Sequence, residues 1–108
     1  MTDLARIRAL LDQRRPGHAL PQEFYTDPEI FAFDIDAIHH RSWTMVGFEA
    51  ELPSPGCALA LTIGRSPVVV VRGRDNALRA FFNSCRHRGA QICADGLSKR
   101  PRLVCPYH

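Results

Sequence analysis

Two short cysteine–histidine segments near the C-terminal end constrain the fold of this chain more than any other feature. The segment Cys85-Arg86-His87 is followed by 17 residues and then by Cys105-Pro106-Tyr107-His108, which gives the pattern C-x-H-x17-C-x2-H. Each segment offers one thiolate and one imidazole. If all four side chains bind one inorganic centre, two separate loops must meet. The pattern therefore predicts a domain built around a pair of facing loops.

The mixture of one cysteine with one histidine in each loop discriminates between kinds of metal centre. A Rieske [2Fe–2S] cluster is asymmetric, with two cysteines on one iron and two histidines on the other. Structural zinc sites more often group a cysteine pair and a histidine pair at wider spacings. The residues therefore predict a Rieske-type cluster, and a tetrahedral Cys₂His₂ zinc site is the alternative. The predicted ligands are Cys85, His87, Cys105 and His108.

Histidine ligands indicate what such a centre would do. Two neutral imidazoles in place of thiolates remove negative charge, so Rieske potentials lie at about −150 to +300 mV, against roughly −400 mV for all-cysteine plant-type clusters. The prediction is a centre that accepts and passes on single electrons. Gly89 suits the backbone of a tight first loop, and Pro106 stiffens the second loop between its two ligands.

The first forty residues predict a helical arm. A helix over residues 3–14, capped by Thr2 or Asp3, is indicated because four apolar residues share one face: Leu4, Ile7, Leu10 and Leu11. An extended connection follows over residues 18–26. Asp27-Pro28-Glu29 combines a capping carboxylate, a proline at the first helical position and an early acid, so a second helix starts there and ends near Arg41.

Beyond the arm, the hydrophobic pattern changes to period two, which predicts antiparallel β-structure. The segment Val68–Val71 is expected to be a fully buried strand, and Gly73-Arg74-Asp75-Asn76 a hairpin turn. The other expected strands cover residues 43–48, 57–63 and 78–82. The predicted fold class is mainly β with an N-terminal helical arm. The predicted domains are an arm over residues 1–41 and a β domain over residues 42–108.

Charge and hydropathy limit the compartments and partners that are expected for the protein. The net charge of +3 over 108 residues is too mild to indicate nucleic-acid binding. The longest apolar run has five residues, far below the ~20 of a membrane helix, and the N-terminus does not resemble a signal peptide. We therefore expect a cytoplasmic protein with no nucleic-acid and no membrane partner, in which cysteines bind metal or are buried rather than form disulfides.

Several other conspicuous residues are expected to be structural. Cys57 is interpreted as a core residue because it falls on the buried face of an expected strand. Cys93 lies between the ligand segments, and burial is favoured over a redox role because the four ligand positions are already filled. Trp43 is interpreted as an anchor of the core. His39 and His40 follow an apolar helix and are expected to be solvated or to act as C-terminal helix charges.

The segments FFNSCRHRGAQIC (81–93) and LVCPYH (103–108) resemble the N-terminal part of the large α subunit of Rieske non-haem iron oxygenases, the ring-hydroxylating dioxygenase type. The resemblance extends upstream through residues 24–48 and 68–73. Within this family the upstream part resembles most the oxygenases of quaternary amines such as glycine betaine, stachydrine and carnitine, with aromatic substrates as the alternative. The extra cysteines of respiratory Rieske proteins are replaced here by Ala90 and Tyr107.

The resemblance implies an electron relay. A ferredoxin or flavin reductase that uses NAD(P)H would reduce the cluster, and the cluster would pass electrons to a mononuclear Fe(II) in a second domain for O₂-dependent hydroxylation or N-demethylation. It also implies a homotrimer. That iron domain and the rest of the Rieske sheet would follow His108, so the chain is expected to be a C-terminally truncated fragment with no catalytic residues and no activity of its own.

Two other functions stay open at this point. A stand-alone Rieske ferredoxin would carry electrons without catalysis, but such proteins begin almost directly with the first strand, whereas about forty residues of helical arm precede it here. A zinc-binding module would use the same four ligands. Arg86 and Arg88 are expected to form a positive rim that attracts an acidic redox partner, and Lys99 and Arg100 are interpreted as ordinary solvated surface.

Overall fold

The computed structural model describes residues 3–107. The chain divides into two compact units, Met1–Thr44 and Met45–His108. No helix among the described residues has the length and apolar character needed to cross a bilayer.

The first unit begins with helix α1 (Leu4–Asp12), whose start is fixed by its cap. The carboxylate of Asp3 accepts a hydrogen bond from the backbone N–H of Arg6 at 3.1 Å, which satisfies one of the free donors at a helix N-terminus. The predicted helix and its Asp3 cap are therefore confirmed. Thr2, the other expected cap, lies outside the described residues.

Helix α3 (Pro28–Ala37) is also confirmed, and its cap connects it to α1. The Asp27 carboxylate accepts from the Glu29 N–H at 2.8 Å and also from the Arg6 guanidinium. The bond from Arg6 is the main cause that holds the pKa of Asp27 below its usual value. Arg6 also lies 3.5 Å from the Glu29 carboxylate, so one arginine joins the first helix to the start of the third.

Two short helices complete the first unit. Helix α2 (Glu23–Thr26) lies where an extended connection was expected, so that prediction is wrong for the last part of residues 18–26. The 3-10 helix η1 (His39–Arg41) ends where the second helix was expected to end. Both of its histidines are exposed, as expected.

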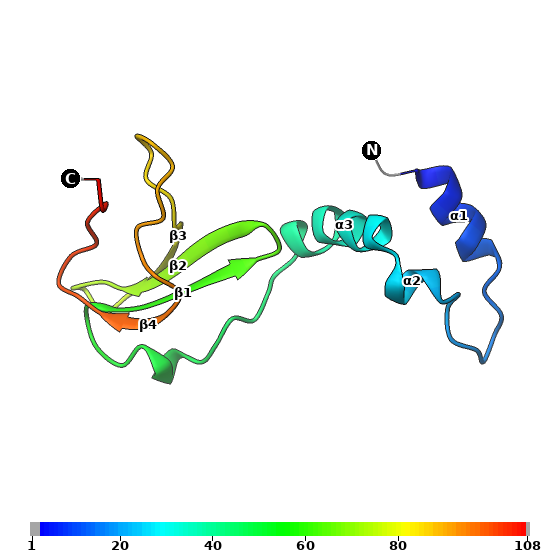
Figure 1. Cartoon of the computed structure of the whole chain (residues 1–108). Coiled ribbons are helices and arrows are strands. Elements are labelled where there is room, and N and C mark those ends of the chain that lie inside the picture. Colours follow the sequence, from blue (N-terminus) through cyan, green and yellow to red (C-terminus); the bar gives the residue numbers. More distant parts are fainter. Residues whose placement is uncertain (1–2, 108) are drawn as a thin grey trace. The chain divides into compact units, whose positions relative to one another are not determined.

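The second unit is a four-stranded antiparallel sheet, in which the predicted meander gains one strand (Figure 1). Strands β1 (Cys57–Ile63), β2 (Ser66–Arg72) and β3 (Leu78–Phe82) were expected. Strand β4 (Gly96–Lys99) was not expected, and it pairs with β1 at the opposite edge from β3. The order is β3-β2-β1-β4, so β3 and β4 are the two edges.

One face of the sheet carries the small hydrophobic core. Ala58, Ala60 and Val69 pack there with Cys93, which is 3% exposed, and Leu103 packs against this cluster. Cys93 and Leu103 come from the segments that contain the predicted ligands. The core therefore attaches both of these segments to the same face of the sheet, and the expected burial of Cys93 is confirmed.

The start of the second unit is held to the sheet by a buried arginine. The Arg72 side chain, 7% exposed, donates to the backbone carbonyls of Leu52, of Asn76 at 2.8 Å and of Glu49 at 3.3 Å. Glu49 begins the 3-10 helix η2 (Glu49–Glu51). A charge with this little exposure is stable because its donors have partners.

Three expectations about the sheet are wrong. Residues 43–48 form no strand, because no other segment of the described chain pairs with them. Trp43 is fully exposed instead of anchoring the core. In Val68–Val71 only Val69 is buried, because the opposite face of β2 is only partly covered.

Candidate metal centre

The first ligand loop, residues 83–95, connects β3 to β4 and is fixed at its base by a buried asparagine. The Asn83 side chain, 1% exposed, accepts from the backbone N–H groups of Ile92 at 3.0 Å and Cys93 at 2.9 Å. Its amide nitrogen donates to the Cys93 carbonyl at 2.8 Å. Its backbone N–H donates to the Pro67 carbonyl at 2.9 Å, so the base of the loop is attached to β2 as well.

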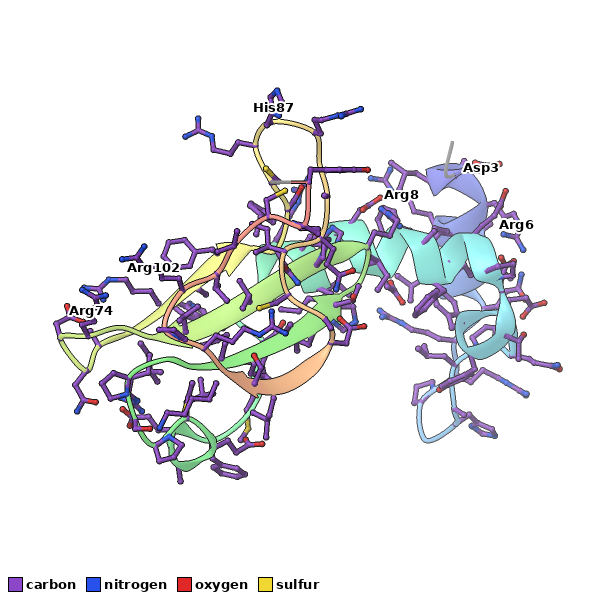
Figure 2. All side chains as sticks on the ribbon, turned by 60° about the vertical axis from the view of Figure 1, so that its left-hand side comes forward. Asp3, Arg6, Arg8, Arg74, His87 and Arg102 are labelled. Atoms are coloured by element: carbon purple, nitrogen blue, oxygen red, sulfur yellow. The ribbon has the colours of Figure 1, made fainter. Side chains whose placement is uncertain are left out.

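The tip of this loop is a tight turn around the first predicted ligands. The backbone N–H of Cys85 donates to the Ala90 carbonyl at 2.8 Å, and the N–H of Gly89 donates to the Cys85 carbonyl at 2.8 Å. Gly89 has φ +71°, in the left-handed region that glycine adopts at no steric cost. The expected role of Gly89 is therefore confirmed. Figure 2 shows His87 at the tip, pointing away from the sheet.

The second ligand loop, residues 100–107, follows β4. Its start is attached to the sheet by the Arg100 N–H, which donates to the Gly56 carbonyl at 3.0 Å, and Leu103 packs against the core. Both ligand loops extend on the same side of the sheet (Figure 1). Cys105 is half-buried, as is Cys85.

The two loops meet at two contacts. The Cys105 thiol lies close enough to the Cys85 thiol to act on its pKa. The pKa of the Cys85 thiol lies below its usual value. The largest cause is the backbone N–H of His87, and the second is the Cys105 thiol. In the second contact, the guanidinium carbon of Arg88 lies 4.9 Å from the centre of the Tyr107 ring. The facing loops predicted from the cysteine–histidine spacing are thus present.

The histidines are not gathered in the same way. His87 is exposed, and within residues 3–107 no three His, Cys, Asp or Glu side chains lie close enough together to hold a metal ion. His108 lies outside the described residues. The structure therefore brings together the two cysteines of the predicted ligand set and leaves His87 apart from them.

Two features of the site suit an iron–sulfur cluster. The Cys105 thiol lies near enough to Cys85 to act on its pKa, and the backbone N–H groups of His87 and Arg88 also lower the pKa of the Cys85 thiol. Such donors stabilise negative charge on a ligand sulfur and are among the factors that set cluster potentials. Sequence reasoning missed Asn83. Its position directly after the β3 residues and two residues before Cys85 was the available signal, because a polar residue there can satisfy the backbone of the loop.

Comparisons with known proteins identify the family of the chain. Residues 42–108 match the family described as the Rieske [2Fe–2S] domain. The glycine betaine monooxygenase oxygenase subunit of Chromohalobacter salexigens is 44% identical over 99 residues, which cover 92% of this chain and 22% of that protein. The biphenyl dioxygenase subunit alpha of Paraburkholderia xenovorans is 35% identical over 102 residues, covering 94% of this chain and 22% of its own length.

A solved structure shows the same fold. The apo form of the quaternary ammonium Rieske monooxygenase CntA superposes with a TM-score of 0.77 at 35% identity, over 83% of this chain and 26% of that chain. The chain thus spans about a quarter or less of the length of the relatives that it matches. The expected resemblance to oxygenase subunits, both quaternary-amine and aromatic, is confirmed. The chain belongs to the Rieske [2Fe–2S] domain family, whose cofactor is the two-iron cluster inferred from its cysteines and histidines.

Proposed function

We propose that this chain is the cluster-binding part of an oxygenase large subunit, with Cys85 and Cys105 on one iron and His87 and His108 on the other. The observation that carries the proposal is the meeting of the two ligand loops. Arg88 lies 4.9 Å from the Tyr107 ring, and the Cys105 thiol acts on the pKa of the Cys85 thiol although 19 residues separate the two cysteines. When bound, the cluster supplies a site that takes up and releases one electron at a time.

The residues of the chain prepare this site in two ways. Asn83 fixes the base of the first ligand loop, and the N–H groups of His87 and Arg88 face the Cys85 sulfur. These donors favour the thiolate form that iron requires. His87 lies at the exposed tip of the loop, so its side chain would turn toward the cysteines when the cluster is inserted.

The helical arm favours an oxygenase over a stand-alone ferredoxin. The match with the glycine betaine monooxygenase subunit extends over 99 residues, more than residues 42–108 contain, so part of the arm is shared with that subunit. We accordingly propose an arm over residues 1–41 and a Rieske domain over residues 42–108, with the mononuclear iron in the remaining part of the full-length protein.

For the full-length protein, the proposed activity is O₂-dependent hydroxylation or N-demethylation. Electrons would come from NAD(P)H through a ferredoxin or flavin reductase, and the protein would act as a cytoplasmic homotrimer. Quaternary amines are the proposed substrate class, because one of the matched subunits is a glycine betaine monooxygenase and one of the matched structures a quaternary ammonium monooxygenase. Aromatic compounds are the alternative, on the match to biphenyl dioxygenase.

The ligand assignment is tested on full-length protein purified without oxygen. Iron, acid-labile sulfide and the electron paramagnetic resonance of the reduced form should report one [2Fe–2S] cluster per chain beside the mononuclear iron. Cys85→Ser, Cys105→Ser and His87→Ala should each lose the cluster signal, whereas His39→Ala, an exposed histidine in the arm, should keep it. Zinc without sulfide, or a cluster that survives loss of both cysteines, would refute the assignment.

The substrate class is tested with the same protein and its reductase. Glycine betaine should give formaldehyde in proportion to NAD(P)H consumed, since N-demethylation releases the methyl carbon as formaldehyde. Biphenyl should give no hydroxylated product. The reverse result would transfer the proposal to aromatic substrates and leave the cluster assignment unchanged.

A further inference from the structure

We propose that Arg88 and Tyr107 act as a positioning pair that holds the second ligand loop against the first before the cluster is present, so that Cys105 stays beside Cys85. This inference rests on the proposed ligand set. It assigns a task to two residues that bind no iron themselves.

The second ligand loop needs such a contact because its own backbone provides little. We find no backbone hydrogen bond from residues 101–107 to another part of the described chain, and Leu103 is the residue of the loop that packs against the core. Cys105 and Tyr107 lie beyond Leu103. Their position therefore depends on contacts made at the far end of the loop.

The contact between Arg88 and Tyr107 lies where it can serve this purpose. Arg88 follows Cys85 by three residues, and Tyr107 follows Cys105 by two, so the pair flanks the thiols in both loops. At 4.9 Å the guanidinium carbon is inside the range of about 6 Å over which a cation is attracted to an aromatic face. The Tyr107 side chain is 59% exposed and contributes nothing to the core, so the arginine is its identifiable structural partner.

The same geometry separates Arg88 from Arg86. Both were expected to form a positive rim, and both are exposed. Within the described residues, the guanidinium of Arg88 lies over an aromatic ring, and that of Arg86 does not. Arg88 therefore has a structural task in addition to any effect of its charge on a redox partner.

The test measures thiol pairing in full-length protein from which the cluster has been removed by a chelator under reducing conditions. Diamide then takes two electrons and two protons from the Cys85 and Cys105 thiols, so that a disulfide forms and diamide becomes the hydrazine. Peptide mapping by mass spectrometry gives the rate at which this disulfide appears. Wild-type protein should form it readily, because the two ligand loops are in contact and the Cys105 thiol lies near the Cys85 thiol.

The variants separate the ring, the charge and the fold. Tyr107→Leu and Arg88→Gln should each slow disulfide formation about two- to fivefold, the ratio that corresponds to an exposed cation–π contact. Tyr107→Phe keeps the ring and should pair at the wild-type rate, and Arg88→Lys keeps a cation and should fall between. The double variant Arg88→Gln/Tyr107→Leu should be no slower than the slower single variant, because both remove one interaction.

Alkylation of Cys93 serves as the control for unfolding, since this thiol is 3% exposed. It should remain protected in every variant. Equal disulfide rates in wild type and Tyr107→Leu, failure of Tyr107→Phe to restore the rate, or loss of Cys93 protection in step with the slower rate would each overturn the positioning role. Wild-type protein that pairs its thiols but never holds iron and sulfide would refute the ligand assignment and leave the positioning role standing.

Discussion

The two ligand loops differ in what holds them. The first ligand loop is fixed at its base by three side-chain bonds of Asn83 and at its tip by two backbone bonds around Cys85. The second ligand loop is attached to the sheet at Arg100 and to the core by Leu103, and its tip contacts the first loop. The first loop is therefore structured by its own sequence, whereas the second takes its position from the first.

This asymmetry has a physical origin in the sheet. The first loop connects two strands that both pair within the sheet, β3 with β2 and β4 with β1, so both of its ends are fixed. The second loop follows the edge strand β4, and within residues 100–107 its bond to the sheet is the one from the Arg100 N–H to the Gly56 carbonyl.

Removal of the Asn83 side chain should have the largest effect on this difference. Asn83→Ala leaves the buried N–H groups of Ile92 and Cys93 without acceptors, so we expect a loss of about 3 kcal/mol in the free energy of unfolding. Urea unfolding of the full-length protein, followed by alkylation of the buried Cys93 thiol, measures this loss.

Gln91→Ala is the matched control for Asn83→Ala. Gln91 donates to the same Cys93 carbonyl at 2.8 Å, but it is exposed and water can replace it. Its loss should cost about 0.5 kcal/mol or less. Equal costs for the two variants would mean that the first loop is not fixed from its base, which would remove the contrast between the loops.

Charge reversal tests whether a redox partner approaches the first loop rather than the second. Arg86→Glu should slow reduction of the cluster by the reductase about tenfold at low ionic strength, because an opposing charge reduces steered association, and the effect should shrink as salt is added. Arg102→Glu makes the same charge change in the second loop, where Figure 2 places Arg102 away from His87, and should have little effect. Equal slowing by both would indicate an effect of net charge alone. Stopped-flow absorbance measures both rates.

Local sequence signals predicted the elements of the fold that depend on near neighbours. The Asp27-Pro28-Glu29 start of α3 and the Asp3 cap of α1 are correct, because caps act within a few residues. The hairpin formed by β1 and β2 is correct for the same reason. The paired cysteines were anticipated from their spacing, because the chemistry of one cluster requires two loops to meet.

The wrong or missed predictions concern features that depend on residues distant in the sequence. Strand β4 has four residues and no alternation, and it exists because β1 offers a free edge, which local sequence does not reveal. Residues 43–48 show strand-like periodicity but pair with no other segment of the described chain, so periodicity alone does not make them a strand. Asn83 was missed for a related reason, since its importance comes from the N–H groups of residues 92 and 93, nine and ten positions later.

The turn at the tip of the first loop should show a smaller effect. Gly89→Ala places a side chain at φ +71°, where open space receives the Cβ, so the cost is backbone strain of about 1 kcal/mol. Hydrogen exchange of residues 85–90 in cluster-free protein should become about fivefold faster, as expected for local opening that is easier by this amount. Gly89→Asn should recover part of the loss, because asparagine tolerates this conformation better.

Gly17→Ala is the matched control for Gly89→Ala. Gly17 has φ +73° and also has open space around it, but it lies in the arm. The same strain there should leave exchange in residues 85–90 unchanged. If it did not, the exchange would be reporting global stability rather than the turn at Gly89.

The smallest effect is expected at Pro106, between the two ligands of the second loop. Pro106→Ala should cost about 0.5 kcal/mol, because proline restricts the unfolded chain and alanine does not. Formation of the Cys85–Cys105 disulfide in cluster-free protein should slow by less than about twofold, and Pro101→Ala, before Leu103, should leave the rate unchanged. If the second loop is positioned mainly by its contact with the first, the stiffness of Pro106 should add little to the position of Cys105. A loss as large as that of Asn83→Ala would show instead that the second loop has a rigid structure of its own.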